Sequence, residues 1–98
     1  MTDAQFLRYA AHRLGVSVPE VRWSSSRAKW PDIWIDGSTV TVTREWALQS
    51  TSERRKRLTH ELLHLRGLLH GRVGKWLYST FPSEDSYSRV VYRSLVNA

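Results

Sequence analysis

The sequence predicts an α+β fold: a small, three-stranded, mostly antiparallel sheet packed on a central helix, with an N-terminal helix and two C-terminal helices. Apolar residues recur at helical spacing near both ends and in the middle of the chain, whereas apolar and polar residues alternate over residues 33–43. The order of helix, strands and helices argues against a doubly wound sheet. With 98 residues and no repeat or linker, we expect a single domain over residues 1–98.

The first helix is predicted to begin after Thr2, because Thr2 and Gln5 have the spacing of a capping box. Gly15 is expected to end it, since glycine readily adopts the left-handed conformation that closes helices. A strand is expected next, over residues 18–23. The apolar side of the helix consists of Phe6, Leu7, Ala10, Ala11 and Leu14.

Residues 33–43 predict a β-hairpin with a two-residue turn at Asp36-Gly37. This turn would pair Ile33 with Val40, and Trp34 with Thr39. Trp34 would then lie among threonines on the polar face, which makes it the best candidate to line a cleft or contact surface. The apolar face would consist of Ile33, Ile35, Val40 and Val42.

A loop over residues 45–51 is expected to lead into the central helix, for which Ser50 and Glu53 form a second capping box. Pro82 is expected to separate the last two helices. The three predicted helices cover residues 52–66, 73–81, and 83 or 84 to 96.

Composition excludes several classes of protein. The chain has no cysteine, which rules out disulfides, thiolate zinc knuckles, iron–sulfur clusters and thiol nucleophiles. No apolar run approaches the ~18 residues of a membrane span, so we expect no membrane partner. The first residues lack the basic and apolar regions of a signal peptide, and the expected location is therefore cytoplasmic.

The central helix carries the residues whose spacing is most specific. His60 and His64 are one helical turn apart, so both imidazoles can reach one metal ion. Glu61 lies beside them, where it can hold a water without being a ligand. Gly67 would let the chain leave the helix so that His70 returns as a third ligand. Three neutral imidazoles leave one coordination position open, which is typical of a catalytic zinc site.

The pattern HExxHxxGxxH over residues 60–70 resembles the motif of the zincin metallopeptidases. Metzincins carry a Met-turn beneath the metal, which Met1 cannot supply. The chain is more similar to the small SprT-like, WLM and YgjP-like domains and to the minimal gluzincins. The order of motifs in residues 22–26, 33–43, 58–65, 70–71 and Trp76 resembles the YgjP-like domains. This resemblance implies a peptidase with one zinc ion on His60, His64 and His70, and with Glu61 as general base.

The third ligand and the residue that stabilises the oxyanion stay open. Glu84 follows His64 by 20 positions, a spacing similar to that of thermolysin-type gluzincins, and is an alternative third ligand to His70. A peptide substrate is expected to lie along an exposed strand. The developing oxyanion needs a second donor besides zinc, and no spacing selects among the candidates Tyr78, Tyr87, Tyr92, Arg72 and Arg89.

A basic run precedes the histidines, within a chain of net charge +6. It predicts a possible weak association with nucleic acid. The second class of function consistent with the sequence is a catalytically silent, metal-stabilised binding module for nucleic acid or a protein partner. The physiological substrate and the oligomeric state are not encoded in any pattern. The run consists of Arg54, Arg55, Lys56 and Arg57.

Overall fold

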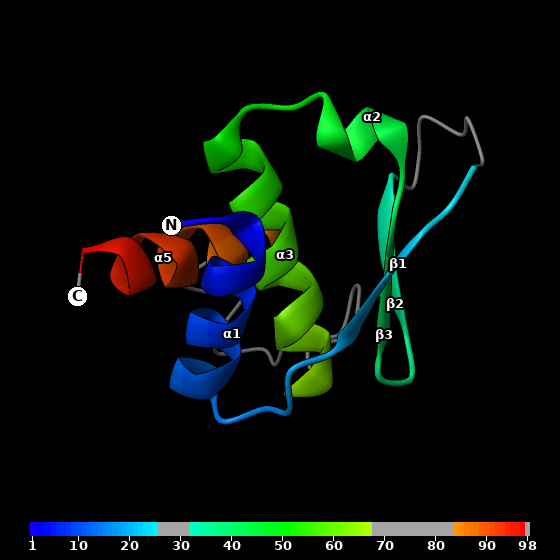
Figure 1. The fold of residues 1–98 in the computed structure, drawn as a ribbon. Helices are drawn as coiled ribbons and strands as arrows, with labels where there is room; N and C mark the ends of the chain where they lie inside the picture. Colours follow the sequence, from blue (N-terminus) through cyan, green and yellow to red (C-terminus); the bar gives the residue numbers. More distant parts are fainter. Residues whose placement is uncertain (26–31, 68–83, 98) are drawn as a thin grey trace.

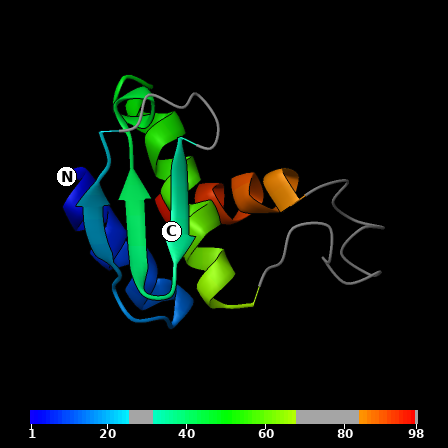
Figure 2. The same cartoon turned by 90° about the vertical axis from the view of Figure 1, so that its right-hand side faces the viewer.

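The computed structural model describes residues 1–25, 32–67 and 84–97, and they confirm the α+β class. Helices α1, α3 and α5 lie on one side of the sheet (Figure 1), and Figure 2 views the sheet from its other side. None of the described helices is long and apolar enough to cross a membrane. The helix predicted over residues 73–81 lies outside the described residues. The elements are α1 (Asp3–Leu14), β1 (Glu20–Trp23), β2 (Ile33–Asp36), β3 (Thr39–Val42), α2 (Arg44–Ala47), α3 (Thr51–Leu65) and α5 (Glu84–Val96).

The sheet is mixed, whereas the sequence predicts a mostly antiparallel one. Its strand order is β1-β3-β2, with β3 antiparallel to β2 and parallel to β1. The parallel pairing arises because the chain reverses twice between β1 and β3, once before β2 and once in the hairpin. Strand β3 therefore lies between the two strands that precede it, and β2 is an edge strand.

The hairpin forms where predicted, but its register differs by two residues. Ile33 pairs with Val42 instead of Val40, and the turn residues are Gly37 and Ser38 instead of Asp36-Gly37. Gly37 has a φ of 59°, whereas Ser38, like every described non-glycine residue, does not have a positive φ. A type II′ turn requires a positive φ at its first central residue only, which is here Gly37. A shift of two residues leaves each side chain on its predicted face, so hydrophobic alternation could not detect it.

Helix α1 matches its prediction closely. Thr2 and Gln5 form the complete capping box, and Gly15 ends the helix with a φ of 70°. Helix α3 begins one residue earlier than predicted, after the N-cap Ser50, whose hydroxyl accepts from the Glu53 amide at 3.2 Å. Local capping chemistry therefore determines both starts.

Helix α2 lies where the sequence predicts a loop. Its N-cap is Thr43, whose hydroxyl accepts from the Trp46 amide, and the buried Trp46 packs against the core. Trp46 is only 6% exposed, whereas Trp23, whose ring meets it edge to face, is 64% exposed. Tertiary packing of Trp46 accounts for a helical turn that its local sequence does not indicate.

One cluster of buried side chains joins the helices to the sheet. Leu58 and Leu62 of α3 lie at its centre, and Leu62 is 0% exposed. The remaining members come from both layers: Phe6, Leu7, Ala10, Ala11, Ile33, Val40, Val42, Trp46 and Leu95. The predicted apolar sides of α1 and the hairpin therefore meet the leucines of α3 in one core.

Leu62→Ala tests this core. The substitution should lower the free energy of unfolding by about 2–5 kcal/mol, because it removes buried contacts and leaves a cavity. Leu48→Ala is the control, since Leu48 is 72% exposed and its loss should cost less than about 0.5 kcal/mol. Urea denaturation followed by tryptophan fluorescence measures both. Equal costs for the two variants would contradict the described core.

Candidate metal centre

Helix α3 positions the predicted site because its two faces are chemically different. Leu58 and Leu62 on one face are buried in the core. His60 and His64 on the other face are half-buried, and His60 contacts Ser88 of α5. The packing of the leucines therefore determines the direction of the histidines.

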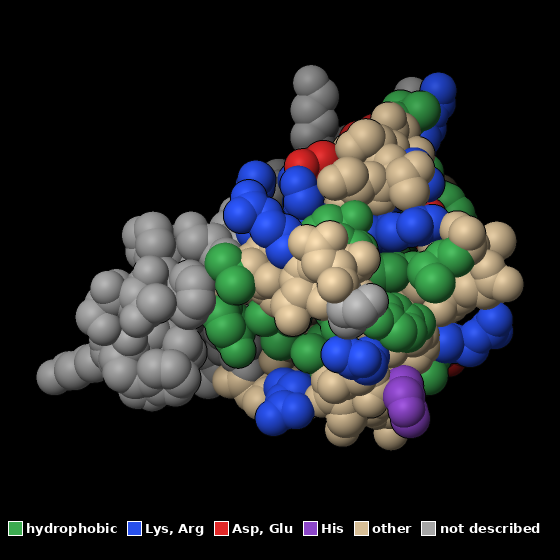
Figure 3. Space-filling model, turned by 90° about the vertical axis from the view of Figure 1, so that its left-hand side faces the viewer, with side chains coloured by type: hydrophobic (Ala, Val, Ile, Leu, Met, Phe, Trp, Pro, Cys, Tyr) green, Lys and Arg blue, Asp and Glu red, His purple; other side chains and the backbone are tan. Residues whose placement is uncertain are grey.

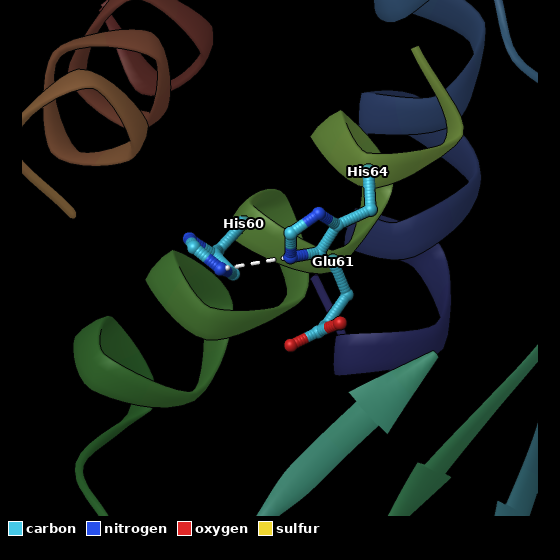
Figure 4. Close-up of side chains that lie close together, drawn as sticks. All are labelled: His60, Glu61 and His64. Atoms are coloured by element: carbon cyan, nitrogen blue, oxygen red, sulfur yellow. Dashed lines mark hydrogen bonds between the residues drawn. The ribbon is translucent and has the colours of Figure 1, made fainter. Parts of the chain in front are cut away.

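The two imidazoles face one another (Figure 4). Their Nε2 atoms are 3.0 Å apart, and the rings are nearly perpendicular, with an interplanar angle of 85°. Ligand atoms of His60, Glu61 and His64 all lie within 4.8 Å of one another. The structure thus brings together three of the four residues of the predicted site.

Ser88 of α5 orients His60. Its hydroxyl is 2.9 Å from His60 Nδ1, and the residue is only 3% exposed. When Nδ1 carries the ring proton and donates to this hydroxyl, Nε2 presents its lone pair toward His64. No pattern in the sequence singles out Ser88, because its contact with His60 joins two helices 28 positions apart.

The two histidines fit zinc. Two imidazole nitrogens bound tetrahedrally at about 2.0–2.1 Å from one zinc ion lie about 3.3 Å apart, close to the observed 3.0 Å. A hydrogen-bonded ring nitrogen on the far side, as in His60, is the usual outer contact of a zinc ligand. The donor set of His60 and His64 therefore suits the predicted ion.

Glu61 is buried beside the histidines, at 7% exposure, and its side chain extends toward β2 (Figure 4). Burial raises the pKa of Glu61 to about 7 from an ordinary value of 4.5. The Ile35 amide donates a hydrogen bond that lowers this pKa, the charge of Asp32 raises it, and Arg57 lowers it. Burial dominates, and the carboxyl can both accept and release a proton near neutral pH.

Several predicted residues cannot be placed in the site. His70, Tyr78 and Arg72 lie outside the described residues. Glu84 is the first residue of α5, and Arg89 is exposed. Two oxyanion candidates have packing roles: Tyr87 contacts Leu63, and Tyr92 meets Phe6 edge to face, with ring centroids 5.9 Å apart.

The basic run at the start of α3 pairs with acids of the protein itself, at distances of 2.8 to 3.4 Å. Burial raises the pKa of Asp3, but two arginines outweigh it and hold the pKa below its usual range. On the face shown in Figure 3, lysines and arginines are scattered among other side chains. Nucleic-acid association through this run stays a prediction. The pairs are Arg54 and Arg55 with Asp3, Lys56 with Glu53, and Arg57 with Asp32.

Trp34 is half-buried and lies between Ile33 and Ile35, which pack in the core, so its side chain is on the sheet face away from the helices. It lines a hollow of about 520 Å³ together with Arg22, Asp36 and Thr41. This hollow is on the opposite side of the sheet from the histidines. It is therefore not part of the candidate metal centre.

Comparisons with known proteins give no relative: no protein family matches the chain, and no curated protein or solved structure is significantly similar to it. The zincin resemblance accordingly stays a prediction based on the motif.

Glu61 should make the stability of the metal-free protein depend on pH. Between about pH 4.5 and 7 the folded state holds the Glu61 proton, whereas the unfolded state has released it. The free energy of unfolding should therefore fall as pH rises through this range. Glu61→Gln should remove that part of the fall, at most about 3 kcal/mol. Urea denaturation in EDTA measures it, and identical pH profiles for the two proteins would contradict the raised pKa.

Proposed function

We propose that the protein is a zinc-dependent peptidase with Glu61 as general base. The observation that carries this proposal is the group formed by His60, Glu61 and His64. Two imidazole nitrogens lie 3.0 Å apart beside a buried carboxyl whose pKa is raised to about 7. A metal-binding histidine pair next to a proton acceptor of neutral pKa is suited to metal-assisted hydrolysis.

The chemistry divides between the ion and the chain. Zinc, when bound, would polarise the peptide carbonyl and lower the pKa of water toward ~7. Glu61 would take a proton from the attacking water and deliver it to the leaving amine as the carbon–nitrogen bond breaks. Ser88 would hold the His60 ring in the tautomer that exposes Nε2.

The edge of β2 is the proposed binding surface for a peptide or protein substrate. The Thr43 amide donates to the Asp32 carbonyl at 3.1 Å, and the alternation of antiparallel bonds turns the backbone groups of Ile33 and Ile35 away from β3. Since the Ile35 amide donates to Glu61, this outer edge of β2 faces the site. A peptide added as a further strand would pair through its main chain, which tolerates varied sequences.

The third ligand is proposed to be His70, because it continues the spacing of the motif after His64 and Gly67. Glu84, the first residue of α5, stays the alternative.

Glu61→Gln tests the proposed activity. The variant should keep the zinc content of the wild type, because its histidines are unchanged, and lose about 10²–10⁴-fold in kcat/KM. Zinc is measured by elemental analysis, and hydrolysis with casein or a fluorogenic peptide, with and without chelator.

Glu53→Gln is the matched control, because it makes the same change on α3 at a residue that pairs with Lys56. It should leave hydrolysis unchanged. A fully active Glu61→Gln protein would contradict the mechanism. Wild-type protein that holds zinc without hydrolysing either substrate would favour the metal-stabilised binding module.

A second pair of variants identifies the third ligand. His70→Ala should weaken zinc binding by about 100-fold or more, whereas Glu84→Gln should change it little. Asp85→Asn controls for the loss of a negative charge at the start of α5. Competition with a zinc chelator measures the affinities. The reverse order of effects would assign the position to Glu84.

A further inference from the structure

A partly buried network of polar side chains joins the start of β2 to α3. Asp32 immediately precedes β2 and is only 2% exposed. Its Oδ1 lies 2.9 Å from Arg57 Nη1, and its Oδ2 accepts a hydrogen bond from Gln49 Nε2. Arg57 Nε in turn donates to Gln49 Oε1 at 2.9 Å. These three side chains, which we call the Asp32 clamp, close a ring of hydrogen bonds between three segments.

The backbone of Asp32 is anchored as firmly as its side chain. Its carbonyl accepts from the Thr43 amide at 3.1 Å and from the Thr43 hydroxyl at 2.7 Å. Asp32 is thus bonded to the end of β3 through its backbone and to α3 through its carboxylate. A carboxylate this deeply buried needs its partners, because an unpaired buried charge is costly.

The Asp32 clamp lies next to the contact between β2 and Glu61. Arg57 precedes Glu61 by four residues, so both side chains lie on one face of α3. On the strand, Asp32 precedes Ile35 by three residues, or roughly 10 Å. The Asp32–Arg57 pair and the Ile35–Glu61 hydrogen bond are therefore successive attachments between the same two elements.

We propose that Asp32, Gln49 and Arg57 are positioning residues that hold the edge of β2 at the distance from α3 at which the Ile35 amide meets Glu61. They would thereby align the strand that binds substrate with the residues that act on it. The effect on catalysis rests on the proposed function, whereas the effect on the Ile35 amide does not.

A second ion pair on the same helix provides a matched control. Asp3 of α1 binds Arg54 and Arg55 at 2.8 and 3.1 Å, and it touches neither β2 nor the histidines in any described contact. Asp3→Asn and Asp32→Asn therefore make the same chemical change at two attachments of α3. Only the second attachment involves β2.

Hydrogen exchange of the Ile35 amide in the metal-free protein tests the clamp directly. Exchange is divided by that of the Leu62 amide, which removes the effect of global destabilisation. Asp32→Asn should raise this ratio by about 10-fold or more, and Asp3→Asn by less than about twofold. An unchanged ratio in Asp32→Asn, or equal increases in both variants, would overturn the proposal.

Arg57→Lys keeps the test decisive if Asp32→Asn does not fold. Lysine retains the charge but cannot donate to both Asp32 and Gln49 from a planar fork. The ratio should again rise severalfold, and no rise would overturn the proposal.

Kinetics then test the consequence for catalysis. Zinc-loaded Asp32→Asn should show a KM for peptide raised by about 10-fold with unchanged zinc content, because no proposed ligand lies on β2. Asp3→Asn should keep the wild-type KM, and equal KM values in the two variants would overturn the positioning role. If the wild type hydrolyses no peptide, the proposed function fails. The hydrogen exchange of the Ile35 amide is then the measurement that tests the Asp32 clamp.

Discussion

The packing of α3 between the sheet and the other helices is the constraint on which the rest of the structure depends. Leu58 and Leu62 are buried on one side of the helix, and this fixes its rotation about its own axis. With that rotation set, His60 meets α5, His64 meets His60, and Glu61 extends toward β2. A rotation of α3 would separate all three from their partners while exposing the leucines, so core and site are determined together.

The candidate site draws on both layers of the fold. Helix α3 contributes the imidazoles and the carboxyl, α5 contributes the hydroxyl of Ser88, and β2 contributes the Ile35 amide. Buried polar groups are stable in such a place only when each has a partner. The arginines of the basic run likewise have partners: they bind Asp3 and Asp32, and these ion pairs attach α3 to α1 and to the start of β2. The basic residues from which the sequence predicts nucleic-acid association therefore also form ion pairs between elements of the fold.

Much of the fold follows from local chemistry and was predictable for that reason. The cap at Thr2, the closing Gly15 and the N-cap Ser50 act within one helical turn, so the sequence displays them directly. Strand pairing is different. The observed hairpin register differs from the predicted one by two residues, because alternation constrains only which face of the sheet a residue occupies. The parallel pairing of β1 with β3 and the helical turn around Trp46 depend on contacts between distant segments, which no local pattern records.

The sequence by itself determined that His60, Glu61 and His64 share one turn of a helix, because helical spacing is a local property. Only the tertiary structure decided that Ser88 meets His60, that Ile35 meets Glu61, and that Asp32 holds the edge strand against Arg57. These partners lie 28, 26 and 25 positions apart, and their contacts exist only once the layers have packed. Burial likewise raised the pKa of Glu61, since removal from water depends on the whole fold and not on neighbouring residues.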